Sequence, residues 1–198
     1  TVYGLTRSQA VCTYGTLTGM AMPFVLFPSA LVNSLAVVLL PVTARHQSAG
    51  NDSGIADGIS MAFRYSLYLG IFCVGVFTVF GEALGLQIFK SQDAGSFIQI
   101  LAWLCPFLYL ATSSGSILNG LGKTKLTFFH HLISLLVRIA FVWFGIPEFG
   151  IRACLWGMLA SEILLALLHI LALRRSVSYD WNVWTFIGKP VFCLLCAL

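Results

Sequence analysis

Two long apolar runs joined by a short turn decide the fold. They are LTFFHHLISLLVRIAFVWFGI from Leu126 to Ile146 and IRACLWGMLASEILLALLHILAL from Ile151 to Leu173, with PEFG (147–150) between them. Each run has the length of roughly 20 residues that an α-helix needs to cross a bilayer. Both runs are continuously apolar, which does not fit the alternating pattern of a membrane β-barrel. The stretch therefore predicts an antiparallel pair of transmembrane helices.

The composition of the whole chain extends this prediction. Of 198 residues, 59% are hydrophobic and only 9% are charged, whereas a soluble domain carries about 25% charged residues. So few charges cannot cover a soluble globule, which excludes a soluble enzyme and a disordered linker. The net charge of +4 is too small to indicate a nucleic-acid partner. We expect an all-α, multi-pass helical bundle in the cell membrane.

Apolar stretches recur along the chain and define the expected spans. These are 13–42, 59–80, 96–118, 126–146, 151–173 and 183–198. The last is too short to cross a bilayer, so we expect five complete helices, a truncated sixth, and a fragment of a longer protein. A polar loop is expected at 44–57 and a short interfacial helix within 81–95. Prolines inside spans favour bends and are hinge candidates: Pro23, Pro28, Pro41 and Pro106.

Lysine and arginine residues divide between the two ends of these spans. The larger group is Arg45, Arg64, Lys123, Lys125, Arg174 and Arg175, and the smaller group is Arg7, Lys90 and Arg152. By the positive-inside rule, the end with the larger group is expected to be cytoplasmic. These cations mark topology, but Arg45, Lys123 and Lys125 are also candidates for binding a lipid headgroup or a pyrophosphate there.

Two ionisable residues lie deep in neighbouring spans. Arg138 precedes Pro147 by nine residues, and Glu162 follows Ile151 by eleven. With a helical rise of about 1.5 Å per residue, both lie roughly 14–17 Å from the turn that joins the two spans. Charges at that depth need a partner or a wet cavity. The favoured interpretation is an ion pair that locks the hairpin; the alternative is a cation that faces a central cavity and meets an anionic substrate.

Other polar and small residues within the spans carry weaker signals. His130, His131 and His169 lie at similar depth, and we interpret them as interfacial residues, with a proton relay as the alternative. Asn33 and Asn119 join Arg138 and Glu162 as candidates for a substrate cavity. Small-residue stripes, Gly15 with Gly19 and Ala111 with Gly115, predict close helix packing. The cysteines predict inert thiols, the C-x-x-C of Cys193 and Cys196 included. No catalytic cluster, metal site or cofactor motif is found in the sequence.

Several short motifs resemble a known family. They are YGTLTGMAMPF (14–24), FPSALVNSL (27–35), LPVT (40–43), SILNGLGK (116–123) and FGIRA (149–153). In this order they resemble the C-terminal lobe of the stage V sporulation protein B group, within the multidrug/oligosaccharidyl-lipid/polysaccharide exporter superfamily. The resemblance implies two lobes around a central cavity, with the N-terminal lobe absent here. Related flippases carry a cation in the helix that matches 13–42; this sequence has no Lys or Arg there, so that site is not transferred.

The resemblance implies a transporter that flips a lipid-linked oligosaccharide or cell-wall polysaccharide precursor by alternating access. Its expected partners are that lipid-linked glycan, membrane lipids and the missing lobe. A cation-coupled multidrug antiporter of the same fold is the first alternative, although it would call for intramembrane carboxylates and only Glu162 lies deep. A membrane-embedded transferase ranks below these because no acidic or His-Asp cluster is present. A membrane scaffold without transport activity is the remaining alternative.

Overall fold

The computed structural model describes residues 7–177, which form helices and no strand. The elements are α1 Arg7–Thr16, the π-helix η2 Leu17–Ala21, α2 Met22–Leu26, α3 Ser29–Ser48, α4 Asp52–Phe89, α5 Gln92–Ala102, α6 Cys105–Gly120, α7 Thr124–Phe149 and α8 Ile151–Ser176. The expected all-α bundle is confirmed. The expected sixth span, 183–198, lies outside the described residues, as do Cys193 and Cys196.

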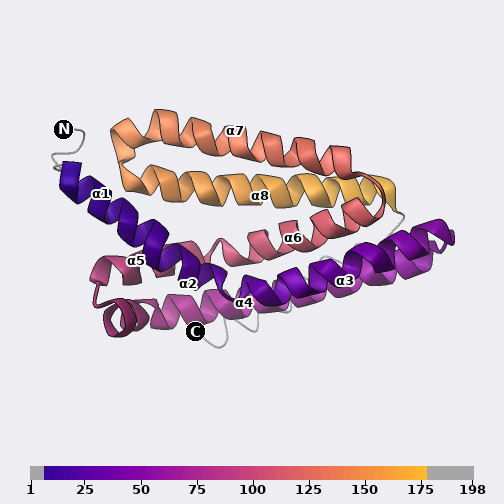
Figure 1. The fold of residues 1–198 in the computed structure, drawn as a ribbon, viewed down its shortest axis with the longest axis horizontal. Coiled ribbons are helices and arrows are strands. Elements are labelled where there is room, and N and C mark those ends of the chain that lie inside the picture. Colours follow the sequence, from indigo (N-terminus) through magenta and orange to yellow (C-terminus); the bar gives the residue numbers. More distant parts are fainter. Residues whose placement is uncertain (1–6, 178–198) are drawn as a thin grey trace.

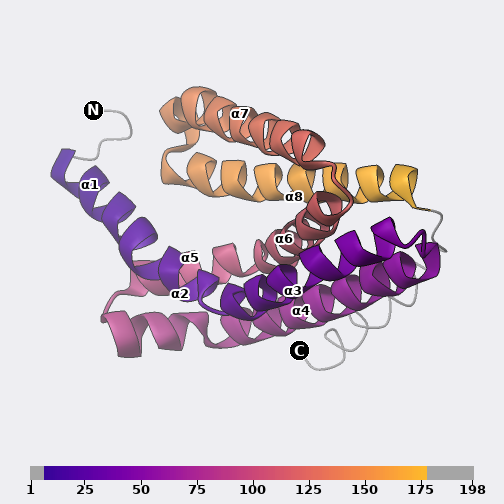
Figure 2. The ribbon, with the colours of Figure 1, turned by 45° about the vertical axis from the view of Figure 1, so that its right-hand side comes forward.

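Helix α6 lies at the centre of the bundle. It packs against α3 and α4 on one side and against α8 on the other, while α7 packs mainly on α8 (Figure 1; Figure 2). The α3–α4 turn, the α6–α7 turn and the end of α8 meet at one end of the bundle, on the right of Figure 1. The α4–α5 and α7–α8 turns and the start of α1 lie at the other end. The turns and helix ends that carry most of the larger group of cations therefore lie opposite those that carry Lys90 and Arg152, whereas Arg64 lies further along α4.

Several helices are long and apolar enough to cross a membrane. Helices α3, α4, α7 and α8 meet this condition by length and composition, and α5 with α6 adds a fifth span if that bent pair is counted as one. Helix α7 exposes large apolar side chains, such as Phe128, Leu136 and Phe144, around most of its surface. In water this exposed apolar surface would be unfavourable. An apolar helix with so little covered surface is stable against lipid.

The expected single bent helix over 13–42 is a series of helical segments. A π-helical turn separates α1 from α2. Phe27 and Pro28 form a turn that separates α2 from α3. Pro23 lies in the first turn of α2, directly after the π-helical turn, which loosens the backbone hydrogen bonding there. Helix α3 runs without interruption through Pro41. The break is therefore at Pro28, and the hinge roles of these prolines stay predictions.

The expected polar loop at 44–57 is wrong, because helix covers most of it. Helix α3 continues to Ser48 and α4 begins at Asp52. The Asn51 side chain accepts a hydrogen bond from the Gly54 N–H at 3.0 Å and thereby caps α4. Capping satisfies a backbone donor that would otherwise favour a loop.

The expected separate interfacial helix within 81–95 is also wrong. Helix α4 continues through Gly81 to Phe89, and Lys90 ends it in a left-handed conformation, φ 51°. Helix α5 then folds back on α4 at Gly95, where an added Cβ would lie 2.9 Å from the Glu82 Cα. Glycine at this crossing allows the two backbones to approach closely, so the segment forms a helical hairpin.

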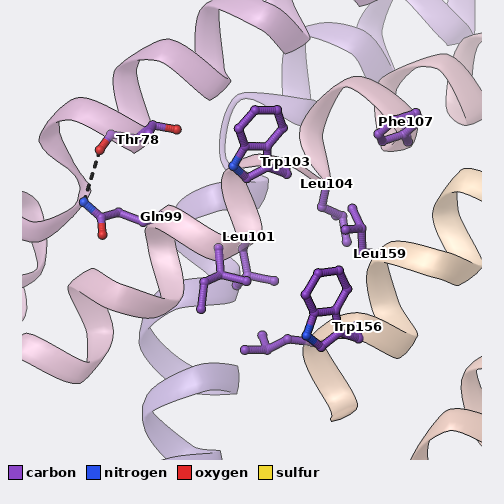
Figure 3. A pocket seen from close by; sticks show the side chains of 10 residues that line it. Thr78, Gln99, Leu101, Trp103, Leu104, Phe107, Trp156 and Leu159 are labelled. Carbon is purple, nitrogen blue, oxygen red and sulfur yellow. Dashed lines mark hydrogen bonds between the residues drawn. The ribbon is translucent and has the colours of Figure 1, made fainter. Parts of the chain in front are cut away.

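The expected span 96–118 is bent near its proline. Helices α5 and α6 meet at an angle of 51°, and Pro106 lies in the first turn of α6. The Gln99 Nε2 donates to the Thr78 carbonyl of α4 at 3.1 Å, which holds α5 on α4 before the bend (Figure 3). Gly70 of α4 packs directly on Pro106. The bend is thus held by contacts on both of its sides.

A buried hydroxyl pair links α4 to α6. The Oγ atoms of Ser66 and Ser113 lie 2.6 Å apart, and both side chains are buried. We expect Ser113→Ala to lower the free energy of unfolding by about 1 kcal/mol, because it leaves the Ser66 hydroxyl without a partner. The double variant Ser66→Ala/Ser113→Ala should lose less than the sum of the single variants. Thermal unfolding in detergent measures both, and strictly additive losses would refute the pair.

Candidate functional site

An ion pair joins α7 to α8 at the depth that the sequence predicted. The Arg138 Nη2 donates to the Glu162 Oε1 at 2.9 Å. The Arg138 Nε also donates to the Ser161 Oγ at 3.1 Å. One turn away, the Ser134 hydroxyl donates to the Ser161 carbonyl at 2.8 Å. The favoured interpretation of an ion pair that joins the hairpin is therefore confirmed.

The helical repeat explains why these groups meet. His130, Ser134 and Arg138 are spaced four residues apart, so they share one face of α7. That face turns toward α8, and its first two members are buried whereas the rest of α7 is largely exposed. On α8, Ser161 and Glu162 occupy the facing turn. A polar seam thus runs along an otherwise apolar helix pair.

A polar pocket of about 330 Å³ opens beside this seam, between α6, α7 and α8. Its lining residues are Leu108, Ala111, Thr112, Gly115, Ser116, Asn119, Thr127, His131, Glu162 and Leu165. Two oxygen atoms in this lining are buried and have no hydrogen-bond partner among the described residues, the Glu162 Oε2 and the Asn119 Oδ1. Four other buried atoms in the described part of the chain also lack a partner: the Thr78 Oγ1, the Ser114 Oγ, the His130 Nδ1 and the His169 Nε2. The two oxygens lie in a pocket lining that also includes one partner of the ion pair, and this combination makes the pocket the candidate functional site.

The histidines form a cluster at the pocket, which His131 lines. His169 is fully buried, and its Nδ1 lies 3.0 Å from the Ala111 carbonyl, to which it can only donate. Its ring lies 5.3 Å from the His130 ring and 5.5 Å from the His131 ring, centroid to centroid. His169 packs inside the bundle, and the interfacial depth of the three histidines stays a prediction. Residues 7–177 contain no group of side chains suited to a metal ion.

Gly115 makes room for this cluster. A Cβ atom at position 115 would lie 3.1 Å from the His169 Cε1, closer than ordinary van der Waals contact. The stripe of Ala111 and Gly115 therefore packs on α8, as predicted. Gly15 and Gly19 differ: an added Cβ at either position meets no atom within 4 Å in the described part of the chain. The packing predicted for that pair is absent from residues 7–177.

The structure separates the cavity candidates that the sequence grouped together. Glu162 and Asn119 line the same pocket, and Arg138 reaches it through Glu162. Asn33 lies on the exposed face of α3 and does not line it. Sequence reasoning missed Thr112 and Thr127. Their helical spacing to Ser116 and His131 was the available signal, because residues four apart share a face.

The cationic candidates lie together at one end of the bundle. Lys123 precedes α7 and its Nζ donates to the Ser176 Oγ of α8 at 2.5 Å. Arg45 in the last turn of α3 and Lys125 are exposed. This end could bind anionic groups, and that role stays a prediction.

A second hollow, of about 570 Å³, is apolar and lies at the α5–α6 bend. Trp103, between α5 and α6, and Trp156 of α8 line it, together with apolar residues that include Leu101, Leu104 and Leu159 (Figure 3). The amide of Gln99 at its edge is engaged by Thr78. This hollow offers apolar contact to a chain or a ring, whereas the polar pocket is where directional hydrogen bonding is possible.

Fold and site together define a multi-pass helical membrane protein with a polar pocket inside the bundle. No family model matches the chain. Three curated proteins of Bacillus subtilis (strain 168) are similar to it. Stage V sporulation protein B is 26% identical over 98% of this chain, and sporulation protein YkvU is 24% identical over 88%. The probable multidrug resistance protein YoeA is 23% identical over 76%. No solved structure matches.

These similarities confirm the resemblance to the stage V sporulation protein B group. The chain is a distant relative of its members, across most of its own length. It spans well under half the length of those relatives: 38% of stage V sporulation protein B, 40% of YkvU and 36% of YoeA.

Proposed function

We propose that this chain is one lobe of a transporter that moves a lipid-linked oligosaccharide or cell-wall polysaccharide precursor across the membrane by alternating access. The observation that supports it best is the polar pocket with a partly buried ion pair at its wall, inside a bundle whose outer surface is apolar. A polar site at membrane depth is typical of a substrate pathway. The lobe has a binding role in this proposal and no catalytic one.

A cation-coupled multidrug antiporter is the second candidate function. The name of the relative YoeA, a probable multidrug resistance protein, favours it. The geometry of the ion pair argues against an antiporter, because one oxygen of Glu162 already accepts a hydrogen bond from the Arg138 guanidinium. A carboxylate held in this way is less available to exchange a cation than a free one.

Reconstitution of the full-length protein in liposomes tests the proposed function. We expect a fluorescent lipid-linked oligosaccharide, placed on one leaflet, to reach the other well above the rate in protein-free liposomes. Accessibility to a membrane-impermeant quencher measures the transfer. The matched measurement follows efflux of a cationic dye from the same vesicles. Dye efflux without lipid movement would replace the flippase by the antiporter, and neither activity would refute both.

A further inference from the structure

Two apolar hollows on the surface of the bundle share one tryptophan. The first is the hollow of about 570 Å³ at the α5–α6 bend, which Leu155, Trp156 and Leu159 line from α8 (Figure 3). The second, of about 540 Å³, lies between α7 and α8, and its lining includes Phe144, Ala153 and Trp156. Trp156 belongs to both linings and is 64% exposed. Both hollows are therefore open to the hydrocarbon of a bilayer beside this exposed indole.

The helical repeat places a cation next to the same tryptophan. Arg152 precedes Trp156 by four residues, so the two share a face of α8, with Arg152 nearer to the end of the bundle. With about 3.6 residues per turn, this face lies between Leu155, which lines the first hollow, and Ala153, which lines the second. The Arg152 side chain is exposed and has no ion-pair partner among residues 7–177. Its guanidinium is therefore available to a ligand that enters both hollows.

The charge of this surface selects an anionic headgroup. No residue that lines either hollow is ionisable, so the hollows themselves suit apolar chains. The acidic residues near this end of the bundle are Glu82, Asp93 and Glu148, and none of them pairs with Arg152 in the described part of the chain. A guanidinium binds a phosphate group through paired hydrogen bonds. The surface is thus complementary to an amphiphile with an anionic phosphate and apolar chains.

The number of hollows indicates how many chains the ligand has. Each hollow lies within the range of about 300–1,000 Å³ that is usual for small-molecule sites. A single chain would fill one hollow and leave the other to unrelated lipid, whereas the two chains of a phospholipid leave one headgroup side by side. Arg152, Trp156 and Leu159 follow one another inward along α8, which is the direction that chains take from a headgroup toward the middle of a bilayer.

We propose that Arg152 binds the phosphate of an anionic two-chain phospholipid, whose chains occupy the two hollows on either side of Trp156. This lipid comes from the surrounding bilayer and is distinct from the transported substrate, so the site goes beyond the proposed function. One chain contacts α5 and α6 and the other contacts α7, and the bound lipid thereby stabilises the packing of these helices on α8.

Brominated phospholipids test the site, because bromine in a lipid chain quenches the fluorescence of a tryptophan that it contacts. The full-length protein is placed in phosphatidylcholine nanodiscs that contain a rising fraction of phosphatidylglycerol with dibrominated chains. We expect this lipid to quench the Trp156 emission, which is the part of the signal that Trp156→Phe removes. Brominated phosphatidylcholine, which carries no net charge, should reach the same quenching only at a much higher fraction.

Variants of two arginines at opposite ends of α8 test the headgroup contact. Arg152→Gln should weaken the binding of phosphatidylglycerol, measured by this titration, about tenfold and leave phosphatidylcholine unaffected, because it removes the charge and the fork of donors. Arg175→Gln, at an exposed position in the last turn of α8, is the matched control and should change neither titration. Equal titrations of both brominated lipids with the wild type would overturn the proposal.

Filling the second hollow tests the number of chains. Ala140 lines that hollow and is exposed, so Ala140→Trp adds a ring there without entering the core. We expect the variant to bind phosphatidylglycerol several-fold more weakly and to bind lysophosphatidylglycerol, which has one chain, as the wild type does. An equal loss for both lipids, or stronger displacement of the brominated lipid by a single-chain polyprenyl phosphate than by phosphatidylglycerol, would overturn the two-chain site. The liposome assay of transport is independent of these results.

Discussion

Arg138→Leu is expected to lower the free energy of unfolding by about 3 kcal/mol. The variant leaves the Glu162 carboxylate buried beside α7 without its cation, and an unpaired buried charge is among the most costly defects in a helical bundle. The Arg138 side chain is 35% exposed, which places the expected loss at the low end of the range for buried pairs. Thermal unfolding of the full-length protein in detergent is the measurement.

Variants that change both residues of the ion pair distinguish a structural role from direct contact with the substrate. Arg138→Leu/Glu162→Leu removes both charges, and we expect it to be more stable than Arg138→Leu alone. The exchange Arg138→Glu/Glu162→Arg keeps the pair with reversed polarity. If the exchanged protein folds and still transports, the pair has a structural role. If it folds but no longer transports, the arginine meets the substrate directly. Equal stability of Arg138→Leu and the wild type would contradict the pairing.

Gly70→Val is expected to destabilise the protein by about 3 kcal/mol. A Cβ atom at position 70 would lie 2.6 Å from the Pro106 Cα, a backbone atom that cannot move aside without shifting the start of α6. Overpacking a core contact typically costs 1–3 kcal/mol, and the β-branched side chain at a backbone contact lies at the upper end. The same measurement of thermal unfolding applies, together with the expression level in membranes.

Gly58→Ala is the matched control for this prediction. Gly58 lies in the same helix, α4, and an added Cβ meets nothing within 4 Å. Alanine is the better helix former, so we expect a gain of about 0.5–1 kcal/mol instead of a loss. If Gly70→Val and Gly58→Ala change stability alike, helix propensity rather than the contact with Pro106 would account for the effect.

Helix ends illustrate where sequence reasoning was insufficient. The polarity of residues 44–57 predicted a loop. In the structure, α3 continues to Ser48 and α4 begins at Asp52, so helix covers most of this stretch. Polar residues form helix as well as loop once a cap such as Asn51 satisfies the first turn. Likewise, a separate interfacial helix was expected within 81–95. Instead, α4 continues to Phe89, and the close packing of Gly95 on α4 allows α5 to fold back on it as a helical hairpin.

The candidate site was predicted in part. The matching depth of Arg138 and Glu162 indicated their ion pair, and Asn119 lines the same pocket as Glu162. Their roles as substrate-cavity residues stay predictions. Asn33 was grouped with them too, but it lies on the exposed face of α3. The burial of His169 against the Ala111 carbonyl had no signal in the sequence, because that contact joins α8 to α6, which lie far apart along the chain.

From its residues alone, this protein is predicted to be a multi-pass helical bundle with Arg138 and Glu162 at matching depth. Both follow from local properties: apolar length sets the spans, and the fixed rise of a helix sets the depth of each residue. The central place of α6, and the meeting of Glu162 and Asn119 at one pocket, come from the tertiary packing. Rotation and crossing of helices depend on close contacts between distant residues, such as Gly70 with Pro106 and Gly115 with His169, which no local pattern reports.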